Sequence, residues 1–421
     1  MGFPIMLSTA VRPLAPSRRR SLRALALAAL ITIAPPTFAE EPLPGADIAS
    51  VRDWLIANNP ELRALQAEAE AAQARIYPAG ALPDPMASIE WQEGDTYEVK
   101  QAFPLWGKRG LARDIASRQA DAAGLERDAT ALTLLARAEA SYVRYWHARE
   151  SVRVVDRRID LLQTIEEVAR ERYALGLAAQ QDSIQAQVAR TNMQRERIER
   201  LAVRREAAAM LNAVLGRPAD APLAEPSEEP ALALPSGALA QALARLEDAQ
   251  HPGLLARIAD VDAADTAAQL QHRQRLPDIT LGLGVMQNED REESLKVMLE
   301  FEIPLQQRVR REREREAGLL ADAARSRLQA LRDELQGQLG QAWAQAESAR
   351  DQRLLIDQTL LPQSRANFES ALASYQVGTV DFGTLLAALE AWQGAELLRV
   401  DVRRDEFLGA AAVRAIVGSV E

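Results

Sequence analysis

Gln101-Ala-Phe-Pro-Leu-Trp-Gly-Lys-Arg109 is the stretch where the chain changes from a strand pattern to a helix pattern. Upstream of it, apolar and polar residues alternate, which is typical of a strand with one apolar face. Downstream, apolar residues recur every three or four positions, which is typical of an amphipathic helix. The same change recurs around Ile303-Pro304-Leu305 in the second half of the chain. The sequence therefore indicates one plan written twice.

Further paired motifs extend this internal repeat over most of the chain. Their separations grow from 192 to 202 residues, as expected of a duplication with a few loop insertions. The pairs are Asn59-Pro60 with His251-Pro252, Leu82-Pro83-Asp84 with Leu276-Pro277-Asp278, and Tyr173-Ala-Leu-Gly176 with Tyr375-Gln-Val-Gly378. We assign residues 40–215 to the first copy and 239–421 to the second, joined by a proline-rich extended linker over 216–238.

Each copy is predicted to form a helix, two short strands, a very long helix, a tight turn that we call the tip, and a last helix. Each long helix would measure about 100 Å, and Pro362 should kink the second one. Arginines and glutamates over 308–316 suit ion pairs between residues four apart on a solvated face. The bounds in the first copy are helix 47–76, strands 85–103, long helix 105–172, tip 173–178 and helix 178–215. In the second copy they are a first helix, strands 279–303, long helix 307–374, tip 375–380 and helix 381–418.

The predicted strands have two distinct faces. From Leu295 to Ile303 every odd residue is apolar, whereas the even residues include Lys296, Glu300 and Glu302. The strand lengths, about 8–10 residues, approach those of tilted membrane-crossing strands. A soluble hairpin with one wet face is the alternative interpretation. A membrane is favoured because the rest of the chain is helical and offers no second sheet to cover the apolar face.

An aromatic residue and two cations come together where the first strands meet the long helix. Trp106 is followed by Lys108 and Arg109. An indole beside basic residues is typical of a bilayer interface. The two cations would bind lipid head groups or pair with nearby acids.

The N-terminus and the composition restrict what the chain can do. Residues 1–39 combine five arginines, no acidic residue and an apolar run over 24–33, which predicts a secretory signal peptide cleaved after Ala39. The 421 residues include no cysteine and three histidines, which excludes disulfides, cysteine-ligated metals and thiol catalysis. Without a catalytic or phosphate-binding motif, we expect no enzyme, no cofactor and no metal site. The excess of 60 acidic over 50 basic residues argues against a nucleic-acid partner.

Together these features resemble the TolC-type outer-membrane efflux proteins. The resemblance rests on the duplicated plan, the stretch 101–109 before a long helix, and the two Tyr-x-x-Gly tips. The ending Gly107-Lys-Arg109 is most similar to the outer-membrane subunits of heavy-metal (cobalt-zinc-cadmium) RND efflux systems. The resemblance extends over residues 47–418.

The resemblance implies a mainly helical fold with a small β part. In a homotrimer, the duplicated helical hairpins would form an α-barrel, and four strands per chain would join a twelve-stranded transmembrane β-barrel. The trimer would be a passive duct in the outer membrane of a Gram-negative bacterium, surrounded by outer-membrane lipid and extending far into the periplasm. A periplasmic adaptor and an inner-membrane RND-type pump would supply energy and selection. The cargo would be heavy-metal cations or other small molecules.

It also implies roles for particular side chains. The apolar strand faces would meet lipid, and the barrel lumen would be lined by Glu90, Glu98, Lys100, Lys296, Glu300 and Glu302. The tips would dock the adaptor through Tyr173, Gly176, Tyr375 and Gly378, because glycine allows the positive φ of a tight reversal. Trp106, Lys108 and Arg109 would lie at the membrane interface.

The gate of the family does not carry over directly. Aspartates that narrow the tunnel mouth in its best-known members fall at Thr384 and Ala387, and a locking arginine falls at Val380. Asp182 and Asp381, one beside each tip, are the candidate gate. Helix capping or a plain solvated charge is the alternative for both aspartates.

Two other classes of function remain as alternatives. A periplasmic adaptor also has a long helical hairpin, but it flanks a single hairpin with β-rich domains. A soluble coiled-coil scaffold would not need the alternating strands. A trimeric duct accounts for both the duplication and the strands.

Overall fold

The computed structural model describes residues 43–92, 94–230, 233–234, 237–248, 251–288 and 293–418. The predicted signal peptide, residues 1–39, lies outside these ranges. All the described residues belong to one structural unit, Leu43–Glu421.

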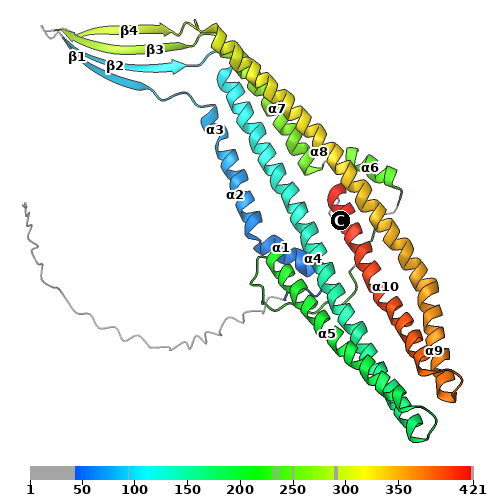
Figure 1. Cartoon of the computed structure of the whole chain (residues 1–421). Coiled ribbons are helices and arrows are strands. Elements are labelled where there is room, and N and C mark those ends of the chain that lie inside the picture. Colours follow the sequence, from blue (N-terminus) through cyan, green and yellow to red (C-terminus); the bar gives the residue numbers. More distant parts are fainter. Residues whose placement is uncertain are drawn as a thin grey trace, which may run out of the picture. The chain divides into compact units, whose positions relative to one another are not determined.

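Long helices make up most of this unit. They lie side by side, with a sheet at one end and the two tips at the other (Figure 1). The first copy contains α1 (Ile48–Asn58), α2 (Pro60–Ala74), α3 (Ile76–Ala79), α4 (Lys108–Ala174) and α5 (Gln180–Val214). The second contains α6 (Leu239–Asp248), α7 (Pro252–Arg273), α8 (Gln307–Leu355), a π-helical turn (Ile356–Leu360), α9 (Leu361–Val377) and α10 (Phe382–Val417). None of the helices described is both long and apolar enough to cross a bilayer.

The central helix is α4, whose 67 residues contact helices of both copies. Shorter helices α2 and α5 lie along successive parts of it (Figure 1). Helices α7 and α10 of the second copy also pack on α4. The two copies therefore share a helical core.

The prediction of one continuous helix over 47–76 is wrong, because three helices replace it. The side chain of Asn59 accepts hydrogen bonds from the backbone N–H groups of Glu61 (2.8 Å) and Leu62 (3.2 Å), and so caps α2. Pro60 follows in the first turn, where its missing N–H leaves no bond unmade.

The matching motif of the second copy has the same structural role. His251 caps α7 by accepting a hydrogen bond from the N–H of Gly253 at 3.2 Å, and Pro252 follows it in the first turn. This agreement supports the duplication inferred from sequence spacing.

The second long helix is interrupted, as its proline predicts. A π-helical turn over Ile356–Leu360 separates α8 from α9, and Pro362 lies in the first turn of α9. A proline inside a helix removes one backbone hydrogen bond and crowds the preceding turn, which a wider π turn accommodates.

The four strands form one antiparallel sheet in the order β1-β2-β3-β4. They are β1 (Met86–Gln92), β2 (Gly94–Phe103), β3 (Ile279–Asn288) and β4 (Glu293–Phe301). The central pair joins the two copies, with Gly94 opposite Asn288 and Phe103 opposite Ile279. Strands β1 and β4 are the two edges of the sheet.

A buried charge helps to join the copies at mid-height. Glu139 of α4 pairs with Arg52 of α1 and, at 3.1 Å, with Arg414 of α10. Two guanidinium groups therefore offset the burial of this carboxylate. Nearby, Trp146 of α4 and Phe407 of α10 meet edge to face, with ring centroids 5.6 Å apart.

The described part of the linker 216–238 contains no helix or strand. It runs back along the first copy, where the N–H groups of Ala224 and Ser227 donate to the carbonyls of Pro44 and Ala46, both at 3.0 Å. This agrees with the predicted extended linker.

Candidate functional site

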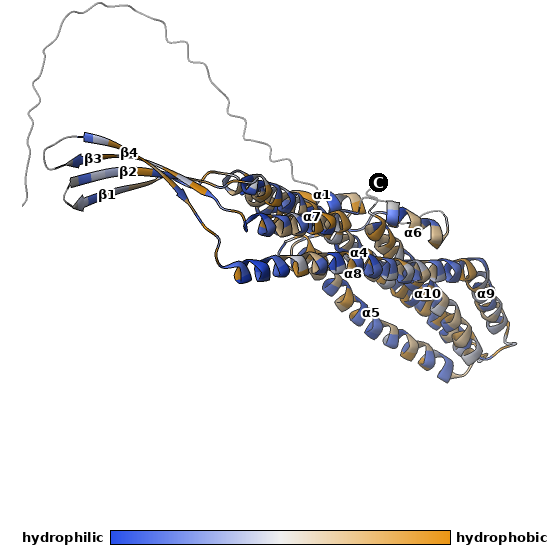
Figure 2. Ribbon diagram, turned by 90° about the horizontal axis from the view of Figure 1, so that it is seen from above, coloured by the Kyte–Doolittle hydropathy of each residue, from blue (hydrophilic) through white to orange (hydrophobic). Residues whose placement is uncertain are grey.

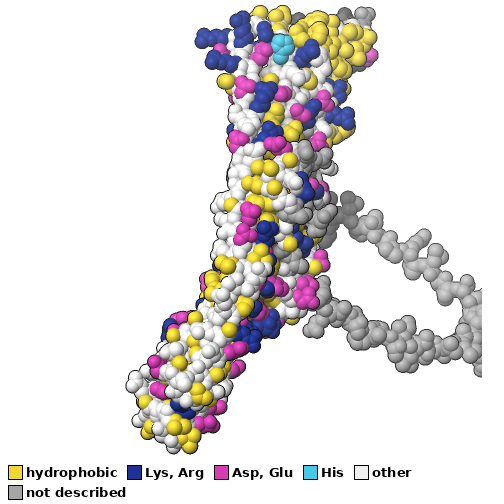
Figure 3. All heavy atoms as spheres, turned by 90° about the vertical axis from the view of Figure 1, so that its right-hand side faces the viewer, with side chains coloured by type: hydrophobic (Ala, Val, Ile, Leu, Met, Phe, Trp, Pro, Cys, Tyr) yellow, Lys and Arg dark blue, Asp and Glu magenta, His cyan; other side chains and the backbone are white. Residues whose placement is uncertain are grey.

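The sheet has one apolar face and one polar face, as the alternation predicts. Cross-strand partners share a face, and two complete apolar rows are Ala87–Val99–Leu283–Val297 and Ile89–Tyr97–Val285–Leu295. Most of these side chains are exposed, up to 76% for Leu295. Figure 3 shows hydrophobic side chains gathered at the end of the unit that carries the sheet.

The polar face carries a cluster of charges around Lys100. Its ammonium lies 2.9 Å from Glu300 and 3.7 Å from Glu98. The Glu98 carboxylate lies across β3, where Gly282 and Gly284 stand beside it. A Cβ at Gly282 would lie 2.9 Å from Glu98 Oε1, so the glycine makes room for the buried carboxylate.

The other predicted lumen residues also fit this arrangement. The register places Lys296 opposite Gly284 and Glu90 opposite Thr96, on the same face as Glu98. Glu302 lies beyond the end of β4, where its carboxylate pairs with Arg310 at 3.2 Å. The six residues are therefore gathered on one side of the sheet or just past its end, and their role in a lumen stays a prediction.

At the other end of the unit, both tips have the backbone expected from their glycines. Gly176 has φ +72° and Gly378 has φ +85°, both in the left-handed region. The turns are short, because α5 starts at Gln180 and α10 at Phe382. A residue with a Cβ would be strained at either glycine.

The two tip tyrosines occupy different environments. Tyr375 is 2% exposed and meets Phe382 edge to face, with ring centroids 5.4 Å apart. Tyr173 is 48% exposed. Tyr173 is therefore available at the surface, as docking requires, whereas Tyr375 belongs to the core of the tips.

Asp182 binds the buried tyrosine across the two tips. The Tyr375 hydroxyl donates to Asp182 Oδ2 at 2.9 Å, which joins the end of α9 to the start of α5. Burial, together with this bond to a negative charge, raises the pKa of Tyr375 to about 12. Capping is not what the Asp182 side chain does, since the N-cap of α5 is Ala179.

A residue that the sequence did not single out completes this contact. Arg172 places its guanidinium 4.7 Å from the ring centroid of Tyr375 and donates to the carbonyl of Leu177 at 3.0 Å. The one sign of its role in the sequence is its position directly before the motif Tyr173-Ala-Leu-Gly176. We call Arg172, Asp182 and Tyr375 the tip lock.

Asp381 has a different local role. Its carboxylate accepts the N–H of Thr384 at 2.7 Å and caps α10. This bond holds the pKa of Asp381 below its usual value. Asp381 is therefore an N-cap, which is the alternative given above for this residue. Asp182 and Asp381 have different partners, so they do not form a pair of equivalent carboxylates.

At the junction of sheet and helices, the three predicted interface residues are used in different ways. Trp106 is half exposed and donates to the carbonyl of Pro277 at 2.7 Å. Lys108 is buried and bonds Asp278 and the carbonyl of Leu276, both at 2.8 Å, so it pairs with an acid.

The Nε–H of Arg109 donates to the carbonyl of Gly80 at 3.0 Å.

The expected ion pairs within 308–316 do not form. Glu314 instead binds His272 (2.8 Å) and Arg275 (3.1 Å) at the end of α7, and these hydrogen bonds lower its pKa. Arg310 pairs outward with Glu302. The prediction of ion pairs within this segment was wrong because residues outside it, in neighbouring elements, pair with its charges instead.

Comparisons with known proteins agree on the fold. No protein-family model matches the chain, and no curated protein matches it significantly. Several solved structures do match. One is CusC, described in connection with transmembrane channel formation. It matches at 14% identity over 89% of this chain and 92% of that chain, with a TM-score of 0.76. The outer membrane protein VceC of Vibrio cholerae matches at 18% identity over 89% and 97%, with a TM-score of 0.74. The open-state outer membrane channel MtrE of Neisseria gonorrhoeae matches at 15% identity over 90% of each chain, with a TM-score of 0.73. The chain thus has the TolC-type channel fold that its sequence resembles, mainly helical with four antiparallel strands.

Proposed function

We propose that this chain is the outer-membrane channel of a tripartite efflux system. Three copies form a passive duct whose strands lie in the outer membrane and whose helices extend into the periplasm. The observation that carries the proposal is the exposed apolar face of a four-stranded sheet with two unpaired edges. The shared fold with outer-membrane channels supports it.

The apolar face argues for a lipid environment. Large contiguous apolar patches are uncommon on soluble monomers, because water penalises them by about 25 cal/mol per Å². Here the whole row from Leu295 to Leu299 on β4 is exposed on one face, and β1 and β2 continue it with Ile89 and Val99. Hydrocarbon is the solvent in which such a face is stable.

The two open edges argue for assembly. Unpaired backbone groups on β1 and β4 are costly in hydrocarbon, so a sheet in the membrane must close on itself. Four strands are too few to close, whereas three copies supply an even-numbered barrel of ordinary size. In that barrel the polar face, with Glu98, Lys100 and Glu300, surrounds water.

The tips are the proposed contact with the periplasmic adaptor of an RND-type pump. Apolar residues at the turns are strongly exposed: Leu175 by 73%, Leu177 by 62% and Val377 by 75%. Together with exposed Tyr173 they offer the apolar knobs that a helical hairpin packs against. The tip lock, which joins the two tips within a chain, is the proposed control of their spacing.

Heavy-metal cations are the proposed cargo. The carboxylates Glu90, Glu98 and Glu300 on the polar face suit passage of cations, and the Gly107-Lys-Arg109 ending favours the metal-efflux subtype. Deleting the coding region and measuring growth with zinc, cobalt, cadmium, copper and a drug panel tests this. Sensitivity to drugs without sensitivity to metals would contradict a metal cargo and leave the channel proposal intact.

One pair of adjacent substitutions tests the channel itself. Val297→Glu puts a carboxylate on the apolar face, whereas Lys296→Glu, one residue away, puts it on the polar face. We expect Val297→Glu to reduce the amount of heat-modifiable trimer in the outer-membrane fraction, because a lipid-facing charge is destabilising. Lys296→Glu should assemble normally and shift the ion selectivity of single channels in planar bilayers.

Other outcomes would favour the alternatives. A wild-type chain that stays soluble and monomeric after signal cleavage would contradict the channel and favour a coiled-coil scaffold. A chain that binds an outer-membrane channel and forms no pores of its own would favour an adaptor.

A further inference from the structure

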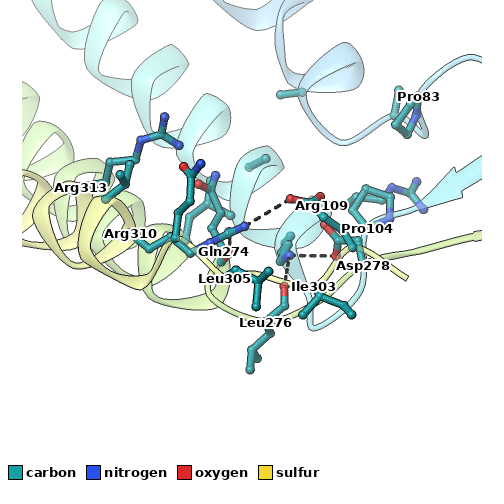
Figure 4. Close-up of a pocket in the computed structure, with 18 residues that line it drawn as sticks. Pro83, Pro104, Arg109, Gln274, Leu276, Asp278, Ile303, Leu305, Arg310 and Arg313 are labelled. Atoms are coloured by element: carbon teal, nitrogen blue, oxygen red, sulfur yellow. Dashed lines mark hydrogen bonds and ion pairs between the residues drawn. The ribbon is translucent and has the colours of Figure 1, made fainter. Parts of the chain in front are cut away.

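We propose that the cavity between the sheet and the helices binds the phosphate group of a phospholipid, in the leaflet nearest the helices. The inference rests on the proposed place of the chain in the outer membrane. The cavity, of about 840 Å³, lies where α4 and α8 begin and α7 ends (Figure 4). We call it the junction cavity.

The charge of the junction cavity is opposite to that of the chain. Its lining includes four cations, Lys108, Arg109, Arg310 and Arg313, and two carboxylates, those of Asp278 and Glu302. The whole chain has a net charge of −10. A local excess of positive charge on an acidic protein points to an anionic ligand.

Two of the four cations already form ion pairs with the carboxylates of the cavity. Lys108 bonds Asp278 at 2.8 Å, and Arg310 donates to the carbonyl of Gln274 and, at 3.2 Å, to Glu302 (Figure 4). These pairs account for both carboxylates. The remaining charge of the cavity therefore belongs to the other two arginines.

Arg109 and Arg313 keep donors for a ligand. Among the described residues, Arg109 bonds only through its Nε, to the carbonyl of Gly80. Arg313 is exposed, and within the described ranges its side chain has no ion pair or hydrogen bond. Guanidinium groups bind phosphate oxygens in pairs of parallel hydrogen bonds, so each of these side chains suits a phosphate better than a single point charge would.

Two helix starts strengthen the same preference. Residues from the first turns of α4 and α8 line the cavity, and neither N-cap, Gly107 or Gln306, supplies a side-chain hydrogen bond. The N–H groups of Lys108 and Gln307 donate to the carbonyls of Leu105 and Leu305, so the N–H groups that follow them in each first turn are the ones that could meet a ligand. Free N–H groups and the partial positive charge at a helix N-terminus favour an anion. The N–H groups and the helix dipoles add to the positive charge of Arg109 and Arg313, which a bound phosphate would balance.

Apolar residues at the rim favour a phospholipid over a free phosphate ion. Ile303 and Leu305 line the cavity and are 72% and 83% exposed. They continue the odd-numbered apolar series of β4, which includes Leu299 and Phe301. Figure 2 shows the hydrophilic start of α8 beside this apolar end of the strands. A phospholipid with its headgroup in the cavity would thus lay its acyl chains along the odd-numbered apolar residues of β4, which we propose to face lipid.

Lipid retention by the full-length trimer tests the proposal. Trimers are reconstituted into phosphatidylcholine bilayers containing phosphatidylglycerol, released, and examined by native mass spectrometry for bound phosphatidylglycerol. Arg109→Gln and Arg313→Gln should each lower retention about five-fold, the effect of one arginine near an anionic lipid surface. Arg327→Gln is the matched control, because Arg327 is also an exposed arginine of α8 without an ion pair in the part of the chain described, but lies outside the cavity. It should retain lipid like wild type.

Several results would overturn the proposal. Equal retention by Arg313→Gln, Arg109→Gln and Arg327→Gln would show that the cavity does not select lipid. Saturable binding of inorganic phosphate, lost in Arg313→Gln while lipid retention stays unchanged, would identify a free-phosphate site instead. If wild-type trimers conduct normally in either case, the channel proposal stands and only the lipid site fails. A wild-type chain that forms no channel overturns both.

Discussion

Tyr173 and Tyr375 lie at matching places, each three residues before a glycine with positive φ, yet one is 48% exposed and the other 2%. The difference arises from the helix that begins after each turn. After the second tip comes Phe382, which is buried against Tyr375. After the first tip comes the polar start of α5, Gln180-Gln181-Asp182, with no aromatic residue at the place of Phe382.

The comparison shows how a duplicated motif divides its roles. Both copies keep the backbone turn, because both keep the glycine. Tyr375 of the second copy is buried between the two tips. Arg172 and Asp182 of the first copy contact its ring and its hydroxyl. We therefore expect substitution of Tyr375 to loosen the tips, and substitution of Tyr173 to affect the binding of partners.

The largest expected difference is between Tyr375→Ala and Tyr173→Ala. Removing a buried aromatic ring costs about 3–5 kcal/mol, so Tyr375→Ala should strongly increase hydrogen exchange at both tips. Tyr173→Ala should change it by less than about 0.5 kcal/mol, as is usual at exposed positions. Native-state hydrogen exchange, read by mass spectrometry on tip peptides, measures the free energy of local opening.

Through direct contact, adaptor binding should depend on Tyr173 more than on Tyr375. Tyr173→Ala should weaken binding to the adaptor while leaving tip exchange unchanged. If Tyr173→Ala loosened the tips as much as Tyr375→Ala, the division of roles between the two tyrosines would be wrong.

The next effect concerns the bond between Asp182 and Tyr375. Hydrogen bonds to charged groups contribute about 1.5–3 kcal/mol when one partner is removed. Asp182→Asn and Tyr375→Phe should each open the tips and raise single-channel conductance. A double-mutant cycle measures their coupling, and strictly additive effects would show that the two side chains act independently.

High pH should break the same bond. The pKa of Tyr375 is raised in the folded chain to about 12 from an ordinary value near 10. The contribution of the hydroxyl is therefore complete below pH 10 and is lost as pH rises toward 12. The Tyr375→Phe channel lacks this hydroxyl and should show no such pH dependence.

The sequence predicted the backbone of this molecule better than its side-chain partners. Alternation and three-to-four periodicity located the strands and helices because burial on one face leaves a regular trace. The paired motifs Asn59-Pro60 and His251-Pro252 marked the repeat, but their role as helix N-caps is a finding of the structure. The break at Pro60 was missed because the apolar pattern continues across it.

Side-chain pairings depend on elements far apart in the chain, which one sequence does not bring together. The charges at 308–316 were expected to pair within α8, but Glu314 binds Arg275, just past the end of α7. Lys108 was expected to bind lipid head groups or to pair with a nearby acid, and its acid is Asp278 of the second copy, a partner that the sequence did not identify. Asp182 follows its tip glycine by six residues and Asp381 follows its own by three, and the two have different partners, which only the packing of α5 on the second copy decides.

A smaller effect compares the two tip glycines. Gly378→Ala and Gly176→Ala should each destabilise their turn by about 1–2 kcal/mol, because both φ values are left-handed. Gly378→Ala should cost slightly more, since its Cβ would lie 3.2 Å from Arg172 of the tip lock, whereas Gly176 has open space. Gly394→Ala in α10, a helical glycine with open space, is the control and should stabilise its helix. Hydrogen exchange at the tips ranks the three variants, and equal effects at 378 and 394 would contradict the strain argument.

The smallest expected effect separates the cap at Asp381 from the gate. Asp381→Ala removes the acceptor of the Thr384 N–H and should speed exchange in the first turn of α10, whereas Asp381→Asn keeps a good N-cap and should not. Because the pKa of Asp381 is lowered in the folded chain, its cap is complete at neutral pH and weakens as pH falls through that lowered pKa. Both variants should leave single-channel conductance and cation block unchanged, since Asp381 acts on its own helix. A loss of cation block in Asp381→Asn, which keeps the cap and removes only the charge, would place this carboxylate in the conduction path and make the two tips equal contributors to the gate.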